Sequence, residues 1–295
     1  MSEPDHTGTY FTAKRHTDTY PTIDPSKKDL TGKYVFITGA SKGIGRATAL
    51  AYARAGCAGI GIGARTDLSE VSSAIAQAAT DAGRPAPQVT TVSLDVTDRA
   101  SVFAAAETIA SSFPRLDILI NNAGYLEIRA PIAETDPDEW LKTWTVNTTG
   151  VYLITRAFLP QILDPNRPGL RTIVNLSSIG AHLIAPGASA YQTSKLAVLR
   201  FTEFLNADHA KDGLVAYAVH PGGVLTDMGR RLPTDRHAFL TETPELCADS
   251  LVFLTETRRE WLAGRYISVT WDMEELLERE EEIVSGDKLR VRMVI

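Results

Sequence analysis

Uninterrupted apolar segments alternate along the chain with longer segments in which apolar residues recur every three or four positions. A continuous apolar run is typical of a strand buried on both faces of a parallel sheet, and the longer period is typical of a covering helix. The continuous apolar run at 34–38 and six further segments predict seven strands, at residues 34–38, 59–65, 88–94, 116–122, 171–177, 214–220 and 265–270. The segments between them predict helices at residues 43–56, 67–83, 97–113, 136–163 and 189–211. This alternation predicts an α/β fold: one domain with a doubly wound, mostly parallel, seven-stranded sheet.

Three of the helix ends carry local signals. Asp67, with Glu70 three residues later, predicts a capping box. The pair Asp136-Pro137 predicts an N-cap followed by proline at the first helical position. Gly56 stands where the first helix is expected to end.

The two ends of the chain differ in composition from its middle. Residues 1–32 are rich in Thr, Asp and Pro and predict an irregular N-terminal arm. This arm is expected to dock through Tyr10, Phe11, Tyr20 and Ile23. Residues 272–295 form a C-terminal tail whose acidic run, 273–282, predicts a solvated helix face. A metal site is not expected there, because the carboxylates have no histidine and no ligand spacing among them.

Bulk composition is that of an ordinary soluble globular chain, with 295 residues, 44% hydrophobic and 22% charged. The net charge of −6 argues against a nucleic-acid partner. We expect no membrane span and no secretory signal, because no apolar run approaches the ~18 residues of a span. Cys57 and Cys247 are the only cysteines and lack metal-ligand spacing, which favours a reducing compartment and no structural disulfide. We therefore expect a cytoplasmic protein.

A glycine-rich turn follows the first strand and opens the first helix, in the sequence TGASKGIG (38–45). Glycines at 39, 43 and 45 allow a tight bend and let backbone N–H groups approach a pyrophosphate. The start of the helix supplies further donors and a partial positive charge. The position of the turn favours a Rossmann-type nucleotide site over a merely structural bend.

The second strand ends in Ala64-Arg65, without the acid that usually binds an adenosine ribose 2′-hydroxyl. Arg65 and Lys42 are two cations that can hold a 2′-phosphate, which favours NADP(H) over NAD(H). Asp67 is close enough in sequence to leave NAD(H) open as the alternative.

Residues 190–195 read AYQTSK, which places Tyr191 and Lys195 four residues apart and on one face of a helix. A free tyrosine has a pKa of about 10, and a nearby cation lowers that pKa by favouring the phenolate. The pair is either a tuned proton donor or an ordinary surface pair, and the motif alone does not decide between them.

Six ordered motifs together resemble the short-chain dehydrogenase/reductase family over residues 33–271, which would form one Rossmann-type cofactor-binding and catalytic domain. The motifs are TGASKGIG (38–45), Asp95-Val96, NNAG (121–124), Ser177-Ser178, YQTSK (191–195) and PGGVLTD (221–227). The arm and the tail are longer than usual for the family, and in this they are similar to fungal biosynthetic members.

The resemblance implies a catalytic set. Tyr191 matches the general acid/base, and Lys195 matches the residue that lowers the tyrosine's pKa and binds the nicotinamide ribose. Ser178 matches the serine that polarises the carbonyl, and is preferred to Ser177 because it precedes Tyr191 by the family's thirteen-residue interval. Asn147, in VNTTG, matches the asparagine that holds a water in a proton relay.

The resemblance also implies the cofactor contacts. Within NNAG it favours Asn122 over Asn121. The expected contacts are Gly39, Ser41, Lys42, Gly43, Ile44, Gly45, Arg65, Asp95, Val96, Asn122, Ala123, Gly124, Tyr191, Lys195, Pro221, Gly222, Val224 and Thr226.

The function implied is an NADP(H)-dependent oxidoreductase that reduces a ketone to a secondary alcohol, or catalyses the reverse, in a secondary-metabolite pathway. A non-redox isomerase or cyclase that retains NADP, and a nucleotide-sensing binding protein, are the alternatives. The substrate is expected to be a mid-sized, partly apolar ketone or polyketide-like alcohol, bound by residues 125–128, 182–186 and 228–245. His182 is an alternative substrate contact, and His220 is expected to be structural. Helices 136–163 and 189–211 are expected to pair with a second copy in a homodimer or homotetramer.

Overall fold

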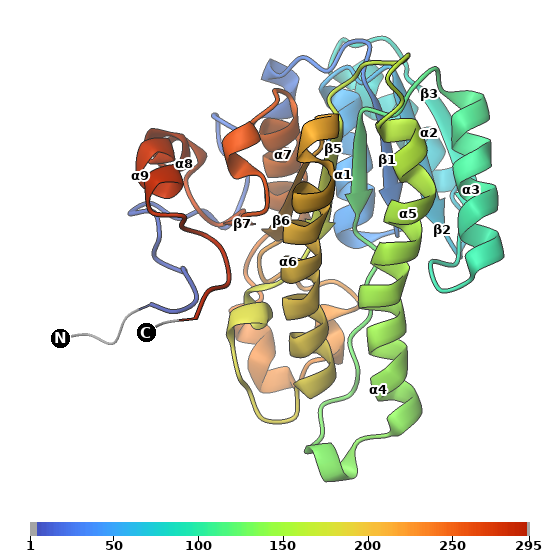
Figure 1. The fold of residues 1–295 in the computed structure, drawn as a ribbon. Coiled ribbons are helices and arrows are strands. Elements are labelled where there is room, and N and C mark those ends of the chain that lie inside the picture. The colour runs from blue at the N-terminus through green and yellow to red at the C-terminus, as the bar shows by residue number, and fades with distance from the viewer. Residues whose placement is uncertain (1–4, 294–295) are drawn as a thin grey trace.

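A seven-stranded parallel sheet lies between two layers of helices in the computed structural model, which describes residues 5–293 (Figure 1). The strand order is β3-β2-β1-β4-β5-β6-β7, and every pairing is parallel. The strands are β1 Tyr34–Thr38, β2 Gly59–Ala64, β3 Gln88–Ser93, β4 Ile118–Asn121, β5 Thr172–Leu176, β6 Val215–His220 and β7 Tyr266–Ser268. All seven predicted strands are present, and the predicted single-domain, doubly wound fold is confirmed.

Nine α-helices accompany the sheet within residues 5–293. They are α1 Gly43–Arg54, α2 Ser69–Asp81, α3 Arg99–Ser112, α4 Pro137–Trp144, α5 Val151–Ile162, α6 Ser189–His209, α7 Pro244–Thr255, α8 Met273–Glu278 and α9 Glu280–Ser285. The sequence pattern did not predict α7, because every residue from Leu246 to Thr255 is buried and no polar face marks a helical period. None of these helices is both long and apolar enough to cross a membrane.

The two faces of the sheet are covered by different helices. Successive side chains of a strand point to opposite faces, so Val35 and Ile37 pack with α1, α2 and α7. Phe36 points the other way, to the layer formed by α3, α5 and part of α6. There its ring stacks on Phe158 of α5, with 4.6 Å between the ring centroids. Both faces are therefore buried, as the continuous apolar strands predicted.

The strand order reverses between β1 and β4. The chain runs outward from β1 to β3, then returns and continues on the far side from β4 to β7. In doubly wound sheets the connections at such a reversal leave a crevice at the carboxyl ends of the strands, where ligands bind. The glycine turn, NNAG, Ser178 and PGGVLTD all follow strands at this edge.

One predicted helix, 136–163, is interrupted. Its N-cap is correct, because the Asp136 carboxylate accepts a hydrogen bond from the Asp138 N–H at 2.9 Å. A π-helical turn, Thr145–Gly150, joins α4 to α5 and contains the predicted catalytic residue Asn147. Such turns insert a residue into a helix and often mark functional sites.

The predicted capping box at Asp67 is wrong. Helix α2 begins two residues later, at Ser69, and the position before it is Leu68. The Asp67 carboxylate instead accepts a hydrogen bond from the Ser69 hydroxyl. This local bond satisfies the carboxylate without the helix starting at Asp67.

Arm and tail pack against each other beside β7 (Figure 1). Ile23 is buried, and Phe11 and Tyr20 are partly buried against the core. Docking through Tyr10 is wrong, because its side chain is 74% exposed. The acidic run is only partly solvated: the Glu275 carboxylate accepts the Ala13 N–H of the arm at 2.6 Å. The domain boundaries at residues 32 and 271 stay a prediction.

Candidate active site

In the glycine turn, the backbone at Gly45 packs directly against the backbone at Gly39. Gly39 has a positive φ of 67°, which favours glycine. A Cβ on Gly45 would lie 2.4 Å from the Gly39 carbonyl oxygen, so a side chain is excluded there. The Asn122 amide braces the turn by donating to the carbonyl oxygens of Thr38, at 2.8 Å, and Gly39, at 3.1 Å.

This turn forms one wall of a cleft of about 480 Å³. Its lining combines the turn, the end of β2, the segments after β3 and β4, the start of α6 and the segment after β6. The predicted cofactor contacts that line it are Gly39, Ser41, Lys42, Gly43, Ile44, Gly45, Arg65, Asp95, Val96, Asn122, Ala123, Gly124, Tyr191, Lys195, Pro221 and Thr226. Four predicted site residues are not among the lining residues: Ser178, Asn147, Gly222 and Val224. A cleft at a helix N-terminus, with glycines at positions 39, 43 and 45 of the turn where backbone can approach a phosphate, fits a dinucleotide.

Tyr191 is the third residue of α6, and a buried carboxylate fixes that end of the helix. Glu127 is 4% exposed and accepts the Tyr191 N–H at 3.0 Å and the Thr143 hydroxyl at 3.2 Å. A carboxylate at a helix N-terminus satisfies an unpaired N–H and complements the helix dipole. Sequence reasoning missed this role for Glu127, because the contact joins residues 64 positions apart.

Lys195 lies one turn further along α6, and its ammonium group is buried. Its Nζ donates to the Leu176 carbonyl oxygen at 2.8 Å and lies 5.7 Å from the centroid of the Tyr191 ring. Burial lowers the pKa of Lys195 to about 8. The side chain is held at the end of β5, inside the cleft.

The expected lowering of the Tyr191 pKa is not what the structure shows. Burial raises the pKa of Tyr191, and the nearby Glu127 carboxylate adds to that effect. A contact with the Ser178 hydroxyl acts in the opposite direction. Desolvation of the phenolate is the largest of these effects.

Ser178 and Tyr191 meet beside Gly180. A Cβ on Gly180 would lie 3.2 Å from the Ser178 Oγ and 3.7 Å from the Tyr191 ring. The Ser178 Oγ also accepts the Gly180 N–H at 3.0 Å. Ser177 lines the cleft, but its hydroxyl is engaged by the Lys195 carbonyl oxygen at 3.0 Å. The position of its hydroxyl beside Tyr191 favours Ser178 as the serine that acts with the tyrosine.

Asn147 is completely buried, and its amide ties two elements together. Its Oδ1 accepts the Tyr125 N–H at 2.8 Å, and its Nδ2 donates to the Tyr125 carbonyl oxygen at 2.9 Å and to the Ser194 hydroxyl at 3.1 Å. Both amide protons are therefore used. The side chain holds the segment after β4 against α6, next to Tyr191.

Arg65 and Lys42 line the part of the cleft where the sequence predicts the adenosine ribose. Arg65 is exposed and has no ion pair with any residue that the structure describes. Lys42 Nζ pairs with the Asp227 carboxylate at 2.5 Å, across the mouth of the cleft. Asp67 does not line the cleft.

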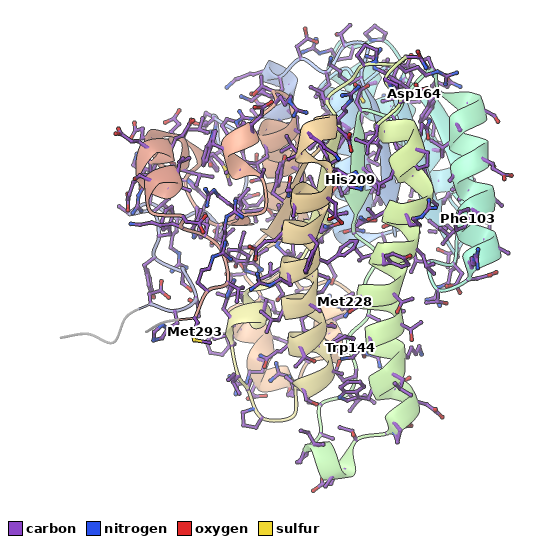
Figure 2. All side chains as sticks on the ribbon, viewed as in Figure 1. Phe103, Trp144, Asp164, His209, Met228 and Met293 are labelled. Atoms are coloured by element: carbon purple, nitrogen blue, oxygen red, sulfur yellow. The ribbon has the colours of Figure 1, made fainter. Side chains whose placement is uncertain are left out.

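The segment after β6 is tied to both walls of the cleft. In addition to the Lys42 pair, Arg231 donates to the Tyr125 hydroxyl at 2.9 Å, and that hydroxyl donates to the Glu139 carboxylate of α4 at 2.5 Å. Between these ties, Met228 reaches over Gly124, because a Cβ there would lie 3.3 Å from the Met228 Cε. Figure 2 labels Met228 in the lower half of the molecule.

The predicted substrate segments are only partly correct. Tyr125, Met228 and Arg230 line the cleft, whereas residues 182–186 do not. His182 instead packs edge-on against Tyr266, with 4.6 Å between the ring centroids. Sequence reasoning missed Lys142 and Val146, two lining residues that no motif marks and that reach the cleft only through the packing of α4 and the π-helical turn.

Comparison with known proteins shows the family to which the chain belongs. The family model described as short chain dehydrogenase matches residues 33–237. Among solved structures, a short-chain type dehydrogenase/reductase from Mycobacterium marinum is similar, with a TM-score of 0.72 and 28% identity over 84% of this chain and 97% of the other. Carveol dehydrogenase from Mycobacterium avium, in complex with NAD, has a TM-score of 0.72 at 22% identity over 82% of this chain and 98% of the other, which shows likeness of fold alone.

Relatives of fungal origin match over almost the whole chain. The short chain dehydrogenase mpl6 of Monascus purpureus is 52% identical over 295 residues, which is 100% of both chains. The short chain dehydrogenase pigC of Monascus ruber is 49% identical over 286 residues, covering 96% of this chain and 93% of the relative. The predicted similarity of the extended ends to fungal members is confirmed, because these matches include the arm and the tail. The chain therefore belongs to the short-chain dehydrogenase family and is an oxidoreductase.

Proposed function

We propose that this oxidoreductase is an NADP(H)-dependent enzyme that reduces a ketone to a secondary alcohol, or catalyses the reverse reaction. One observation carries the proposal: Tyr191 and Lys195 line the same cleft as the glycine turn, and the Ser178 hydroxyl lies beside the Tyr191 ring. A proton donor, a buried cation and a hydroxyl thus converge where a nicotinamide dinucleotide, which membership of the family implies, would place its reactive ring.

When bound, the reduced nicotinamide supplies a hydride to the carbonyl carbon. Tyr191 transfers its hydroxyl proton to the carbonyl oxygen, so that the ketone becomes an alcohol. Burial raises the pKa of Tyr191 and therefore keeps it protonated at neutral pH, as a proton donor requires. The Ser178 hydroxyl is placed to donate to the same oxygen and to stabilise the negative charge that develops on it.

Lys195 supports the phenolate that Tyr191 becomes after proton transfer. With a pKa of about 8, its ammonium group is largely charged at pH 7. Its position is fixed by the Leu176 carbonyl oxygen, which leaves its remaining donors for the cofactor ribose. Because both amide protons of Asn147 are engaged, we assign Asn147 a positioning role. A water could bind only to a second lone pair of its Oδ1, which already accepts the Tyr125 N–H.

The preference for NADP(H) is supported by charge. Arg65 lines the cleft, is exposed and forms no ion pair among residues 5–293, although its charge helps to lower the pKa of the Asp95 carboxyl. Asp67, the alternative acceptor for a 2′-hydroxyl, does not line the cleft and is hydrogen-bonded to Ser69. A planar guanidinium suits a phosphate.

Our proposed substrate is an apolar ketone. The resemblance of the arm and the tail to those of fungal biosynthetic members suggests that this ketone is formed in a secondary-metabolite pathway. Leu225 lines the cleft and is 38% exposed. The three segments predicted to bind substrate expose further apolar side chains, at Ile128, Ile184 and Phe239, which are 72%, 102% and 70% exposed. Exposed apolar residues that gather beside a cleft commonly mark a binding surface.

Absorbance at 340 nm tests the proposal. The purified protein is mixed with NADPH or NADH and a panel of aryl and alkyl ketones, and loss of absorbance reports hydride transfer. We expect turnover with NADPH and at least one ketone. Tight NADPH binding without turnover of any ketone or alcohol would favour a nucleotide sensor, and conversion of a substrate without loss of NADPH would favour an isomerase or cyclase.

A further inference from the structure

The outward edge of β7 is covered by both ends of the chain. β7 pairs with β6 on one side only and is the last strand of the sheet. On its other side, the Tyr266 N–H donates to the Leu289 carbonyl oxygen of the tail at 2.8 Å. Just beyond the strand, the His16 N–H of the arm donates to the Thr270 carbonyl oxygen at 2.9 Å, and Arg15 forms an antiparallel bridge with Trp271. Backbone groups that an open edge would leave free are therefore occupied from within the chain.

The arm is anchored at this place by buried contacts. Trp271 is completely buried, and its indole N–H donates to the Gly8 carbonyl oxygen at 2.8 Å. The Asp272 carboxylate pairs with the His16 Nε2 at 2.8 Å. These contacts hold the arm alongside the residues that follow β7.

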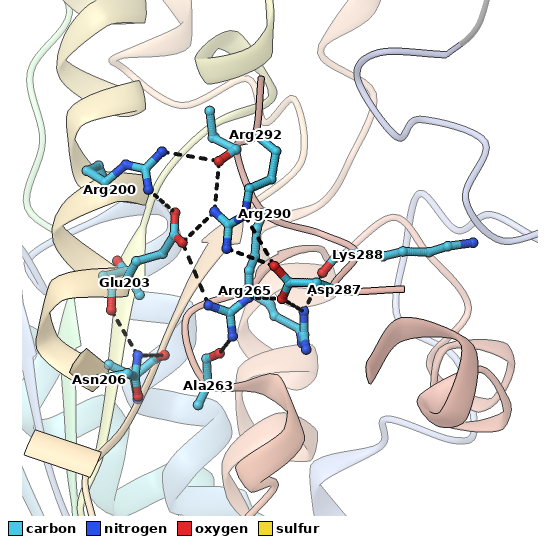
Figure 3. Close-up of polar contacts among 12 residues, drawn as sticks. Arg200, Glu203, Asn206, Ala263, Arg265, Asp287, Lys288, Arg290 and Arg292 are labelled. Atoms are coloured by element: carbon cyan, nitrogen blue, oxygen red, sulfur yellow. Dashed lines mark hydrogen bonds and ion pairs between the residues drawn. The ribbon is translucent and has the colours of Figure 1, made fainter. Parts of the chain in front are cut away.

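The tail is held to α6 by a group of ion pairs centred on Glu203, whose side chain is only 12% exposed (Figure 3). The Glu203 carboxylate lies 2.7 Å from Arg292, 3.7 Å from Arg290 and 3.2 Å from Arg200. Arg292 also pairs with Asp287 at 2.9 Å. We call Glu203, its three arginine partners and Asp287 the tail clasp.

A second tie joins the tail to the residue that precedes β7. The Arg265 guanidinium, which is 6% exposed, donates to the Lys288 carbonyl oxygen at 2.6 Å and lies 3.4 Å from the Asp287 carboxylate. The Arg290 guanidinium donates to the Ala263 carbonyl oxygen at 2.8 Å. The tail is thus fixed on both sides of the Leu289 contact.

We propose that the arm and the tail form a strap that closes the β7 edge of the sheet against a second copy of this chain. Open edge strands present unpaired N–H and C=O groups that pair readily with another strand, and proteins commonly cover such edges. If the β7 edge were open, we expect a second copy of the chain to pair with it. An identical β7 presents the same unpaired N–H and C=O groups, and a two-fold axis would let the two strands hydrogen-bond to each other. With the strap in place, association of copies through β7 is blocked, and any oligomer must use another face.

Two altered chains test the strap. The first ends at Gly286 and lacks the tail residues that contact β7 and α6. The second is full-length Glu203→Gln, which removes the central charge of the tail clasp but keeps its shape. Asp208→Asn is the matched control, because Asp208 is exposed on the same helix and has no ion pair among the described residues.

Molar mass is measured by light scattering from 1 to 100 μM, and amide exchange of β7 by mass spectrometry. We expect the shortened chain to gain an association step, doubling the full-length mass at the upper concentrations. In Glu203→Gln, the Tyr266 amide should exchange at least about tenfold faster than in Asp208→Asn, because local opening of the tail frees it.

A shortened chain that is folded by near-ultraviolet circular dichroism and keeps the full-length mass at every concentration would overturn the proposal. If the shortened chain does not fold, the exchange measurement decides. Equal Tyr266 exchange in Glu203→Gln and Asp208→Asn would then overturn it.

Discussion

Cofactor choice should depend on Arg65 far more than on Lys42, although both line the ribose end of the cleft. Hydrogen bonds to charged groups contribute about 1.5–3 kcal/mol each. The Arg65 fork can donate two to a 2′-phosphate, and its exposure calls for a discount of about half. The remaining ~1.5–3 kcal/mol corresponds to a preference of roughly ten- to a hundredfold for NADPH over NADH in kcat/KM.

Lys42 should contribute less, because its ammonium group must first leave Asp227. The two side chains are 2.5 Å apart and exposed, at 70% and 66%. A phosphate that binds Lys42 therefore replaces one anion by another. Lys42→Ala should lower the NADPH preference by less than about fivefold, and Asp227→Asn should raise it slightly, since the competing carboxylate is gone.

Arg65→Asp reverses the charge and supplies an acceptor for a 2′-hydroxyl. We expect the NADPH preference to fall at least tenfold, mainly through KM for NADPH, in steady-state assays at 340 nm. Lys211→Asp is the control, because it makes the same charge change at an exposed position outside the cleft. The wild-type preference should also weaken as salt is raised. Equal use of both cofactors by the wild type, or an unchanged preference in Arg65→Asp, would refute this reasoning.

Three further predictions concern catalysis, stability and assembly. Lys195→Ala should lower kcat by at least about a hundredfold and also weaken NADPH binding, measured by fluorescence titration; a change in kcat alone would contradict the proposed ribose contact. Burial lowers the pKa of His220 to about 3 in the folded protein, below its value of 6.5 in the unfolded chain. Between these two pH values only the unfolded chain binds a proton at His220, so the unfolding free energy falls as the pH drops from 6.5 toward 3. The unfolding free energy, measured with urea, should fall between pH 7 and pH 5 by about 2 kcal/mol more in the wild type than in His220→Gln. An equal fall in both proteins would contradict the low pKa of His220. Finally, α4, α5 and α6 each expose a large apolar side chain: Leu141 is 57% exposed, Tyr152 50% and Phe204 58%. We therefore expect these helices to pair with a second copy, so that light scattering at micromolar concentration gives at least twice the 32.1 kDa mass of one chain. A mass of 32.1 kDa would contradict this pairing.

Local pattern was enough to predict the sheet. Its central strands are buried on both faces and therefore mostly apolar, whereas the edge strand β3 is largely polar and only partly buried. The same reasoning failed for α7, which is buried all round and shows no polar face. It also merged α4, the π-helical turn and α5 into one helix, since apolar period does not distinguish a single inserted residue. Helices 136–163 and 189–211 were expected to pair with a second copy through apolar residues beyond their core faces. Two of those residues, Val151 and Leu199, are only 5% exposed and belong to the core.

The candidate site could be predicted as far as its motifs extend. Glycine spacing and the Tyr191–Lys195 interval are local, and the structure brings those residues into one cleft. The Glu127 contact with α6 and the Lys42–Asp227 pair join residues 64 and 185 positions apart, so no spacing rule reveals them. The Tyr191 pKa also depends on burial, which sequence reasoning could not weigh against the lysine charge.

Proton donation by Tyr191 is the central claim, and Tyr191→Phe tests it most directly. The substitution removes only the hydroxyl and leaves the partly buried ring in place. NADPH affinity, measured by fluorescence titration, should stay within about threefold of the wild type, while kcat for ketone reduction should fall by ~10²–10⁴-fold. A Tyr191→Phe protein that binds NADPH normally and keeps more than about a tenth of the wild-type kcat would contradict the assignment.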